Sequence, residues 1–432
     1  MSEIPVARRR RVWLGRLTGA PVSRILLGSV IGQGAVLLVS PALTRLYTPA
    51  DFGALAIVTA VSAVLGNLVT LSWERAVVVP ANEDEAKDVV ALGLISVLVL
   101  SLGLGAAAYF LQHGLAELLS SSIFIDFWWL VPATVAAIGV YSIASSWLVR
   151  RQLYTGLAVR NAVQGLSQAV SSVALGLIGL APLGLVSSVG VGRVAGLIGM
   201  FRPRHRLRGQ RESKLRATAG LYKKFPLVNT WSRILNSLGL QLPVILIVGL
   251  FGSLEAGLYA LSLRVLASPV AIVADAVSQY FEGSFALKYR TAEHGLVATI
   301  SQLSRRLALV GALPVLVILS TGPWLFGFVF GEEWATAGFY AQLLVLSYYA
   351  QFIVSPVSRA LVILGRQTTQ LAWDASRLIA TAAAVLVSWA AGAEFVICAI
   401  ALAAVQVVWY AALYVLCQSA ARSAERELNE SA

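Results

Sequence analysis

The sequence has 432 residues, of which 58% are hydrophobic and only 12% are charged, and its formal net charge is +12. A soluble protein of this length usually has about 25% charged residues, so the composition excludes an ordinary soluble protein. Apolar runs of about 18 residues or more recur along the whole chain, and each can cross a bilayer as a helix. Because backbone groups in lipid must be satisfied within the segment, these runs predict an all-α polytopic membrane protein.

Twelve segments are predicted to span the membrane, six on each side of a basic stretch. They are 24–46, 52–72, 88–111, 124–149, 158–180, 183–201, 226–250, 255–281, 298–320, 334–358, 368–390 and 393–417. The predicted parts are an N-terminal six-helix bundle at 1–201, a basic cytoplasmic connector at 202–224, a C-terminal six-helix bundle at 225–418 and a cytoplasmic tail at 419–432.

The distribution of cations predicts the orientation. The segments on the side of the two termini carry 29 of the 33 Lys and Arg residues. The positive-inside rule therefore places both termini in the cytoplasm. The connector contributes nine of these cations, and at a membrane surface they meet anionic lipid first, so no nucleic-acid partner is expected.

The two halves show a weak internal repeat. The sequence at Asp51–Ala56 resembles that at Glu255–Ala260, an offset of 204 residues. With six spans in each half, both halves start on the same side, which predicts a parallel repeat, a plan that occurs among transporters.

No metal or cofactor site is expected. The three histidines are isolated from one another, and Cys398 and Cys417 lie 19 residues apart on one predicted helix. At 1.5 Å rise per residue that separation is roughly 28 Å, which excludes a disulfide within a straight helix. The sequence has no phosphate-binding loop or hydrolytic triad, so neither an enzyme nor a nucleotide-driven pump is predicted.

Polar residues follow several predicted spans at helical spacing. Arg233 and Arg264 lie inside spans, where a charge costs about 2.5–3.5 kcal/mol or more unless it faces water or a partner. Either they line a hydrated path, or they snorkel or pair with Asp275 or with another helix. Further candidates for a polar path are Gln33, Asn229 and Asn236. Net cationic residues inside a polar path favour an anionic, partly polar substrate.

Other polar residues in the spans favour structural roles. Arg193 lies on a helix face of small residues, which is typical of helix packing. Asn161 and its polar neighbours on the fifth span are predicted to form interhelical hydrogen bonds. Asp374 and Arg377 are spaced for a local ion pair.

Several motifs resemble those of one family. Ser40–Gly53 (SPALTRLYTPADFG) resembles the first-loop pattern of bacterial polysaccharide flippases of the multidrug/oligosaccharidyl-lipid/polysaccharide exporter superfamily, and Trp73–Pro80 resembles their next motif, which more often has Tyr at the position of Trp73. Similar pieces are Arg151-Gln152, Gly257–Ala260 with Arg264, and Phe330–Trp334 followed by Ala337-Gly338. Together they cover most of the chain in order.

The resemblance implies a translocase for undecaprenyl-pyrophosphate-linked oligosaccharide in the bacterial inner membrane, serving O-antigen, capsule or exopolysaccharide assembly. Our mechanistic hypothesis is alternating access by rocking of the two halves, with Arg233 and Arg264 binding phosphate or acidic sugar and with Arg75 and Arg359 helping to load the substrate near the inner mouth. Candidates for coupling to an H+ or Na+ gradient are Asp275, Glu74 and Asp374. Membrane lipids are expected partners, and a polysaccharide polymerase and chain-length machinery are candidate partners.

Three alternatives stay open. A drug/cation antiporter of the same superfamily would favour an acidic cavity, whereas the arginines favour the opposite. A membrane-embedded polymerase or glycosyltransferase would be expected to have a sizeable outer loop or an interfacial carboxylate pair. A non-catalytic scaffold leaves the aligned intramembrane charges unexplained.

Overall fold

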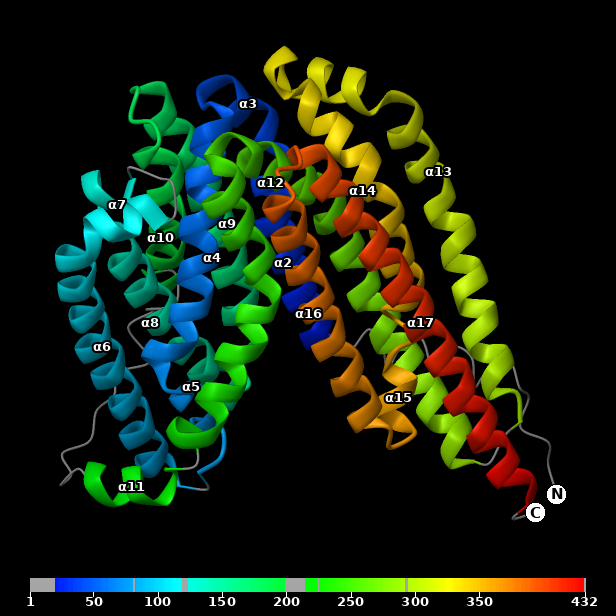
Figure 1. Cartoon of the computed structure of the whole chain (residues 1–432). Helices are drawn as coiled ribbons and strands as arrows, with labels where there is room; N and C mark the ends of the chain where they lie inside the picture. Colours follow the sequence, from blue (N-terminus) through cyan, green and yellow to red (C-terminus); the bar gives the residue numbers. More distant parts are fainter. Residues whose placement is uncertain are drawn as a thin grey trace. The chain divides into compact units, whose positions relative to one another are not determined.

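The computed structural model describes residues 20–80, 82–118, 123–198, 214–223, 225–291 and 294–430. All regular elements within these ranges are helices, which confirms the predicted all-α class (Figure 1). The chain forms two compact units, and each is described by itself.

The helices up to the connector are, in chain order, α2 (Ala20–Leu38), α3 (Ser40–Leu46), α4 (Pro49–Thr70), α5 (Trp73–Ala76), α6 (Glu83–Leu118), α7 (Ile123–Asp126), α8 (Leu130–Arg150), α9 (Tyr154–Leu177) and α10 (Leu183–Ile198). After it come α11 (Leu215–Leu221), the π-helix η2 (Phe225–Asn229), α12 (Thr230–Arg290), α13 (Leu296–Phe330), the 3₁₀ helix η3 (Glu332–Trp334), α14 (Ala335–Val354), α15 (Arg359–Ile363), α16 (Gln367–Ala390) and α17 (Phe395–Glu430).

Nine helices of the described chain are long and apolar enough to cross a membrane. The twelve predicted spans all coincide with helices. The difference in number has three causes: α9 is polar, α10 is short, and α12 contains two predicted spans that meet at Gly252. Gly252 has φ 89°, a left-handed value that glycine adopts easily, and it divides α12 into two arms.

Unit 1 comprises described residues within Met1–Leu46, Val58–Glu117 and Ser122–Gln241, and unit 2 those within Tyr47–Ile57, Leu118–Ser121 and Leu242–Ala432. The division between the units therefore falls inside α4 and inside the first arm of α12. The predicted connector at 202–224 lies mostly outside the described residues. That two six-helix bundles move as separate bodies stays a prediction.

Unit 1 is built around α9, which packs against α2, α8 and α10. At Gly32 and Gly165 the backbones of α2 and α9 are in direct contact, because a Cβ atom on Gly165 would overlap the backbone of Gly32. Such close approach is typical of membrane helices that pack through small residues. It brings the polar residues of α9 to the centre of the unit.

Unit 2 has an aromatic core. Phe281 and Phe285 of α12 stack with ring centroids 4.9 Å apart and pack with Trp373 and Tyr410 of α16 and α17. The fully buried Trp334 contacts the ring of Phe52 edge-on, with the ring centroids 4.8 Å apart.

The repeat motifs meet within unit 2. A Cβ atom on Gly53 would overlap the carbonyl of Ser253, and one on Gly257 would overlap the carbonyl of Pro49. The offset of 204 residues maps Pro49 onto Ser253 and Gly53 onto Gly257, so the contact is reciprocal. The predicted repeat thus corresponds to a symmetric helix contact in which both glycines are required by space.

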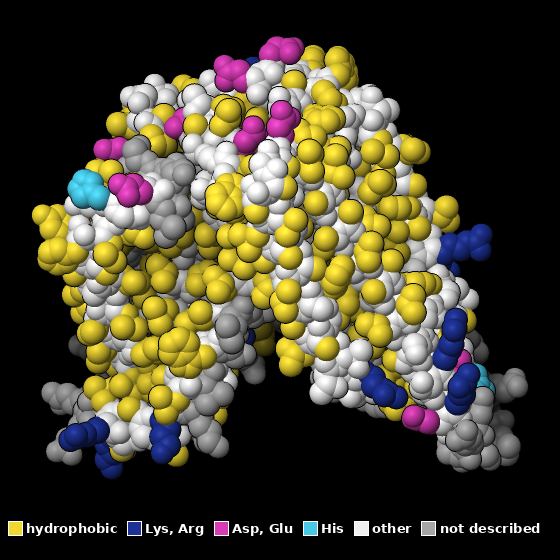
Figure 2. Space-filling model, in the orientation of Figure 1, with side chains coloured by type: hydrophobic (Ala, Val, Ile, Leu, Met, Phe, Trp, Pro, Cys, Tyr) yellow, Lys and Arg dark blue, Asp and Glu magenta, His cyan; other side chains and the backbone are white. Residues whose placement is uncertain are grey.

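Hydrophobic side chains cover the visible lengths of the helices, and Lys and Arg side chains lie toward helix ends (Figure 2). In unit 1 they gather where α11 and the start of α6 are drawn, and in unit 2 most lie along the lower parts of the helices in this view. This pattern is that of helices embedded in a bilayer, with charges kept at the interfaces. The chain is a multi-pass membrane protein.

Candidate functional site

The short helix α5 carries the first polar element of the candidate site. Leu71 and Ser72 have positive φ angles of 46° and 56°, and this turn directs Glu74 inward, where it is 4% exposed. Its carboxylate forms an ion pair with Arg233 of α12, whose side chain is 23% exposed. A predicted substrate-binding residue and a predicted coupling residue thus lie together within unit 1. This pairing with another helix is one of the two alternatives that the sequence left open for Arg233.

Hydroxyl groups hold the first arm of α12 beside this pair. The Thr230 hydroxyl donates a hydrogen bond to Ser72 Oγ at 3.2 Å, and the Ser237 hydroxyl donates one to the carbonyl of Ala63 at 3.2 Å. The ion pair is therefore flanked on both sides by contacts that fix α12 against α4 and α5. Arg75, the neighbour of Glu74, is exposed.

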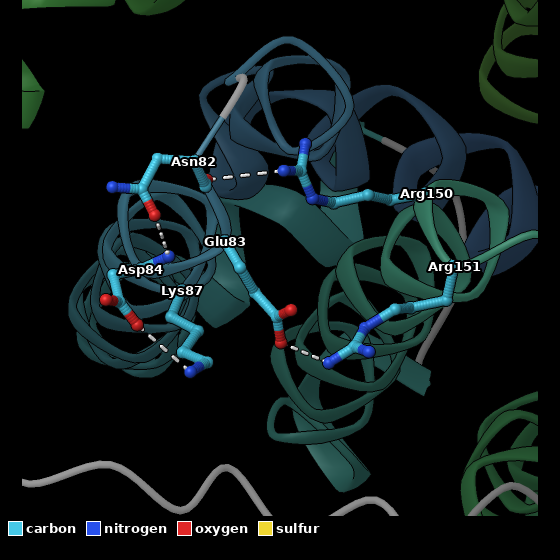
Figure 3. Close-up of polar contacts among 6 residues, drawn as sticks. All are labelled: Asn82, Glu83, Asp84, Lys87, Arg150 and Arg151. Carbon is cyan, nitrogen blue, oxygen red and sulfur yellow. Dashed lines mark hydrogen bonds and ion pairs between the residues drawn. The ribbon is translucent and has the colours of Figure 1, made fainter.

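The segment after α5 is anchored by the end of α8. The Arg150 guanidinium donates hydrogen bonds to the carbonyls of Val77, Pro80 and Asn82 at 3.2, 2.7 and 3.3 Å. Figure 3 shows the Asn82 contact together with the Arg151–Glu83 ion pair and the Lys87–Asp84 ion pair, which measures 3.1 Å. Arg150 thus provides hydrogen bonds to backbone carbonyls of the segment that follows helix α5.

A second polar cluster lies among α2, α8, α9 and α10. Two arginines face the ring of Tyr141: the guanidinium carbons of Arg160 and Arg193 lie 4.3 and 4.8 Å from its centroid. Arg160 is 9% exposed, and it donates to Asn161 Oδ1 from Nε at 3.2 Å and from Nη2 at 2.6 Å. Its Nη1 donates to Ser145 Oγ.

Asn161 connects this cluster to two other helices. It accepts a hydrogen bond from the Tyr141 hydroxyl at 3.3 Å and donates one to Ser29 Oγ of α2 at 2.9 Å. The predicted interhelical role of Asn161 is therefore observed.

Two arginines belong to this cluster. Arg193 packs next to Gly192 and Gly196, as its small-residue face predicts, and it also lies over Tyr141. Arg160, near the start of the predicted fifth span, is buried within the bundle. The polar face of α9, on which Arg160 precedes Asn161 and Gln164, was the sequence signal for this cluster.

The remaining predicted site residues are spread over both units. In unit 1, Gln33 is exposed and Asn229 is half-buried in η2. In unit 2, Arg264 is half-buried, and Arg359 and Asp374 are exposed. The side chains of Asn236 and Asp275 lie outside the described residues.

Asp374 and Arg377 each have a contact of their own. Asp374 accepts a hydrogen bond from Gln370 at 3.3 Å, while the Arg377 guanidinium lies over the Trp373 ring at 5.1 Å. The predicted ion pair between them is not among the contacts of the described residues. Among the described residues, no group of three or more His, Cys, Asp or Glu side chains could hold a metal ion.

The fold and the polar residues between the helices indicate the class of membrane protein to which the chain belongs. Long apolar helices in two units, with arginines between the helices of one of them, are features that many membrane transporters share. The chain belongs to the polysaccharide biosynthesis protein family, whose model matches residues 42–338. This match confirms the family resemblance predicted from the motifs. A search of proteins with curated descriptions finds no match.

Several solved structures have a fold similar to that of this chain. The lipid II flippase MurJ in an inward closed conformation has a TM-score of 0.71 at 10% identity and covers 95% of this chain and 90% of its own. An inward-facing multidrug resistance MATE transporter has a TM-score of 0.63 at 12% sequence identity. The match covers 94% of this chain and 99% of the transporter chain. A MOP-superfamily transporter from Pyrococcus furiosus has a TM-score of 0.56 at 11% sequence identity. The match covers 94% of this chain and 96% of that transporter. These likenesses define the fold.

Proposed function

We propose that this chain is a flippase that moves undecaprenyl-pyrophosphate-linked oligosaccharide units across the bacterial inner membrane for O-antigen, capsule or exopolysaccharide assembly. The observation that carries the proposal is the match of residues 42–338 to the polysaccharide biosynthesis family. The likeness to a lipid II flippase supports it, because that fold accommodates a lipid-linked sugar. The chain is proposed to be a transporter without enzymatic activity.

The charge inside unit 1 supports an anionic substrate. Arg160, Arg193 and Arg233 lie among its helices, and of these only Arg233 contacts a carboxylate within the described structure. A cation antiporter would be expected to present the opposite charge. The proposed binding residues for the pyrophosphate or an acidic sugar are Arg233 and Arg264, and Gln33, Asn229 and Asn236 are proposed to bind sugar hydroxyls. Arg75 and Arg359, both exposed, are proposed to load the substrate.

The Glu74–Arg233 pair suggests how a proton could drive the cycle. The carboxylate of Glu74 and an incoming pyrophosphate compete for the same guanidinium, so protonation of Glu74 would release Arg233 for the substrate. Substrate binding would in turn favour protonation, because coupling between two sites is reciprocal. Glu74 is thus the coupling candidate with the clearest contact. Asp374 and Asp275 are the further candidates for H+ or Na+.

The proposed topology has both termini in the cytoplasm, and the proposed partners are membrane lipids, a polysaccharide polymerase and chain-length machinery. The cation distribution along the sequence supports this orientation.

The decisive experiment deletes the gene and measures lipid-linked oligosaccharide in each leaflet of the inner membrane. Inner-leaflet accumulation of complete units is expected, whereas incomplete glycan would indicate an enzyme and unchanged glycan would exclude both. Complementation then compares Arg233→Ala and Arg264→Ala with Arg366→Ala, an exposed arginine outside the proposed site. Full export by Arg264→Ala at normal protein level would show that Arg264 is not part of the site.

A further inference from the structure

The cluster around Tyr141 contains two positive charges that the described structure does not neutralise. Among the described residues, Arg160 donates hydrogen bonds to the neutral side-chain oxygens of Asn161 and Ser145. No hydrogen bond to Arg193 is found among the described residues, and its buried Nε has no partner. No described Asp or Glu pairs with either arginine.

The two arginines lie within helices, away from the helix ends. Arg160 is six residues after the start of α9 at Tyr154, and Arg193 is five residues before the end of α10 at Ile198. At 1.5 Å rise per residue these positions are roughly 9 and 8 Å from the helix ends. An arginine in this environment is expensive unless a counter-charge or water meets it, and in membrane proteins such residues mark ligand paths.

The packing holds Arg193 in place over the ring. A Cβ atom on Gly196 would lie 3.0 Å from Tyr141 Cε2, and one on Gly192 would lie 2.9 Å from the Cβ of Gln168. The two glycines therefore let α10 press against α8 and α9 on both sides of Arg193. The aromatic face supports the guanidinium without neutralising its charge, and the planar donor fork stays free for a bidentate acceptor.

We propose that Arg193, backed by Arg160 and Tyr141, forms a binding site in unit 1 for an oxyanion of the phosphate class. Arg193 supplies the donors, because its buried Nε has no hydrogen-bond partner in the described structure. Arg160 is held by Asn161 and Ser145 and supplies charge, and Tyr141 is the platform for both. The site is separate from the Glu74–Arg233 pair, and it stands whether or not the chain flips oligosaccharide, because its occupancy is measured without transport.

The test uses the purified full-length chain in a detergent without phosphate, with inorganic pyrophosphate as the probe. Thermal unfolding is followed against pyrophosphate concentration, with sodium chloride at equal ionic strength as the reference. The wild type is expected to show a saturable rise of the unfolding temperature. Arg193→Gln is expected to weaken the apparent affinity by about tenfold or more, as for the loss of a charge-assisted hydrogen bond.

The matched control is Arg151→Gln. Arg151 lies in the same unit and also stacks on an aromatic ring, that of Trp147 at 5.1 Å, but it is exposed and paired with Glu83. Its affinity for pyrophosphate is expected to equal that of the wild type. Arg193→Lys, which keeps the charge but loses the planar fork, is expected to lie between wild type and Arg193→Gln.

A second measurement distinguishes a free phosphate group from a lipid headgroup. Native mass spectrometry counts phosphatidylglycerol molecules retained by wild type and by Arg193→Gln. Retention that is lost in the variant and displaced by pyrophosphate assigns the site to a lipid headgroup, and pyrophosphate binding without retention assigns it to a soluble or substrate phosphate. Equal pyrophosphate affinity and equal lipid retention in both proteins, or no binding of either probe by the wild type, would overturn the proposal.

Discussion

Unit 1 holds its buried arginines in two different ways. Arg233 has a carboxylate partner in Glu74, whereas Arg160 and Arg193 have the face of one tyrosine and neutral oxygens. A paired charge contributes through its partner, so the loss of either member leaves the other uncompensated. An intramembrane charge without a counter-charge destabilises the folded state, so its removal is expected to raise the free energy of unfolding. The difference separates an arginine whose charge a carboxylate balances from two arginines without a carboxylate partner among the described residues.

Breaking the ion pair is expected to have the largest effect. Glu74→Gln leaves Arg233 without a counter-charge and should lower the free energy of unfolding by about 3 kcal/mol, at the lower end for a buried pair because Arg233 is partly exposed. Reversible denaturation of the detergent-solubilised protein measures this change. The double variant Glu74→Gln/Arg233→Gln should be more stable than Glu74→Gln alone. If the double variant is the less stable of the two, the pair is not the interaction that Glu74 makes.

Removing the aromatic platform should have the next largest effect. Tyr141→Leu deletes the ring that both arginines contact and should lower the free energy of unfolding by about 2 kcal/mol. Tyr141→Phe is the matched control, since it keeps the ring and loses only the hydroxyl that donates to Asn161. Its expected effect is about 0.5–1 kcal/mol in the same denaturation assay. Equal effects of the two substitutions would contradict a role for the ring face.

Removing an arginine that has no carboxylate partner should stabilise the protein, in contrast to the two substitutions above. Arg193→Met keeps an apolar stem of similar length and should raise the free energy of unfolding by about 1 kcal/mol in the absence of phosphate. The same denaturation assay, run beside Glu74→Gln, measures both variants on one scale. A destabilisation as large as that of Glu74→Gln would mean that the two arginine environments are alike.

The exposed pair at the end of α8 provides the smallest effect. Arg151 and Glu83 are 44% and 48% exposed, so water screens their attraction. Arg151→Gln should change the free energy of unfolding by no more than about 0.5 kcal/mol. Raising the salt concentration should reduce even this difference. If Arg151→Gln lowered the free energy of unfolding nearly as much as Glu74→Gln, the exposure of an ion pair would not determine its contribution to stability.

The fold could be predicted well from the sequence because apolar length is a local property. The seventh and eighth spans were predicted to end at 250 and to begin at 255, and the structure bends α12 at Gly252 between them. α9 was placed correctly, although its polar face removes it from the set of clearly apolar helices.

The site was harder to predict because its contacts are not local. Glu74 and Arg233 are separated by 159 positions, and each could be singled out by its charge, but no spacing rule pairs them. Arg160 falls within the predicted fifth span, but its burial could not be predicted, because a hydropathy window does not show that α9 packs against α2, α8 and α10. Arg193 was recognised as intramembrane, but its contact with Tyr141 of α8 depends on how α10 packs.

The reciprocal contact of Gly53 and Gly257 also bears on the ancestry of the chain. A contact in which one copy of a motif meets the second copy, and the second meets the first in the same way, has the geometry of a two-fold homodimer interface. A half-length precursor with one such glycine would have met its own copy through this surface. Duplication and fusion of the gene would then place both copies of this surface in one chain. A larger residue at Gly53 or Gly257 would then require a compensating change in the helix that it contacts.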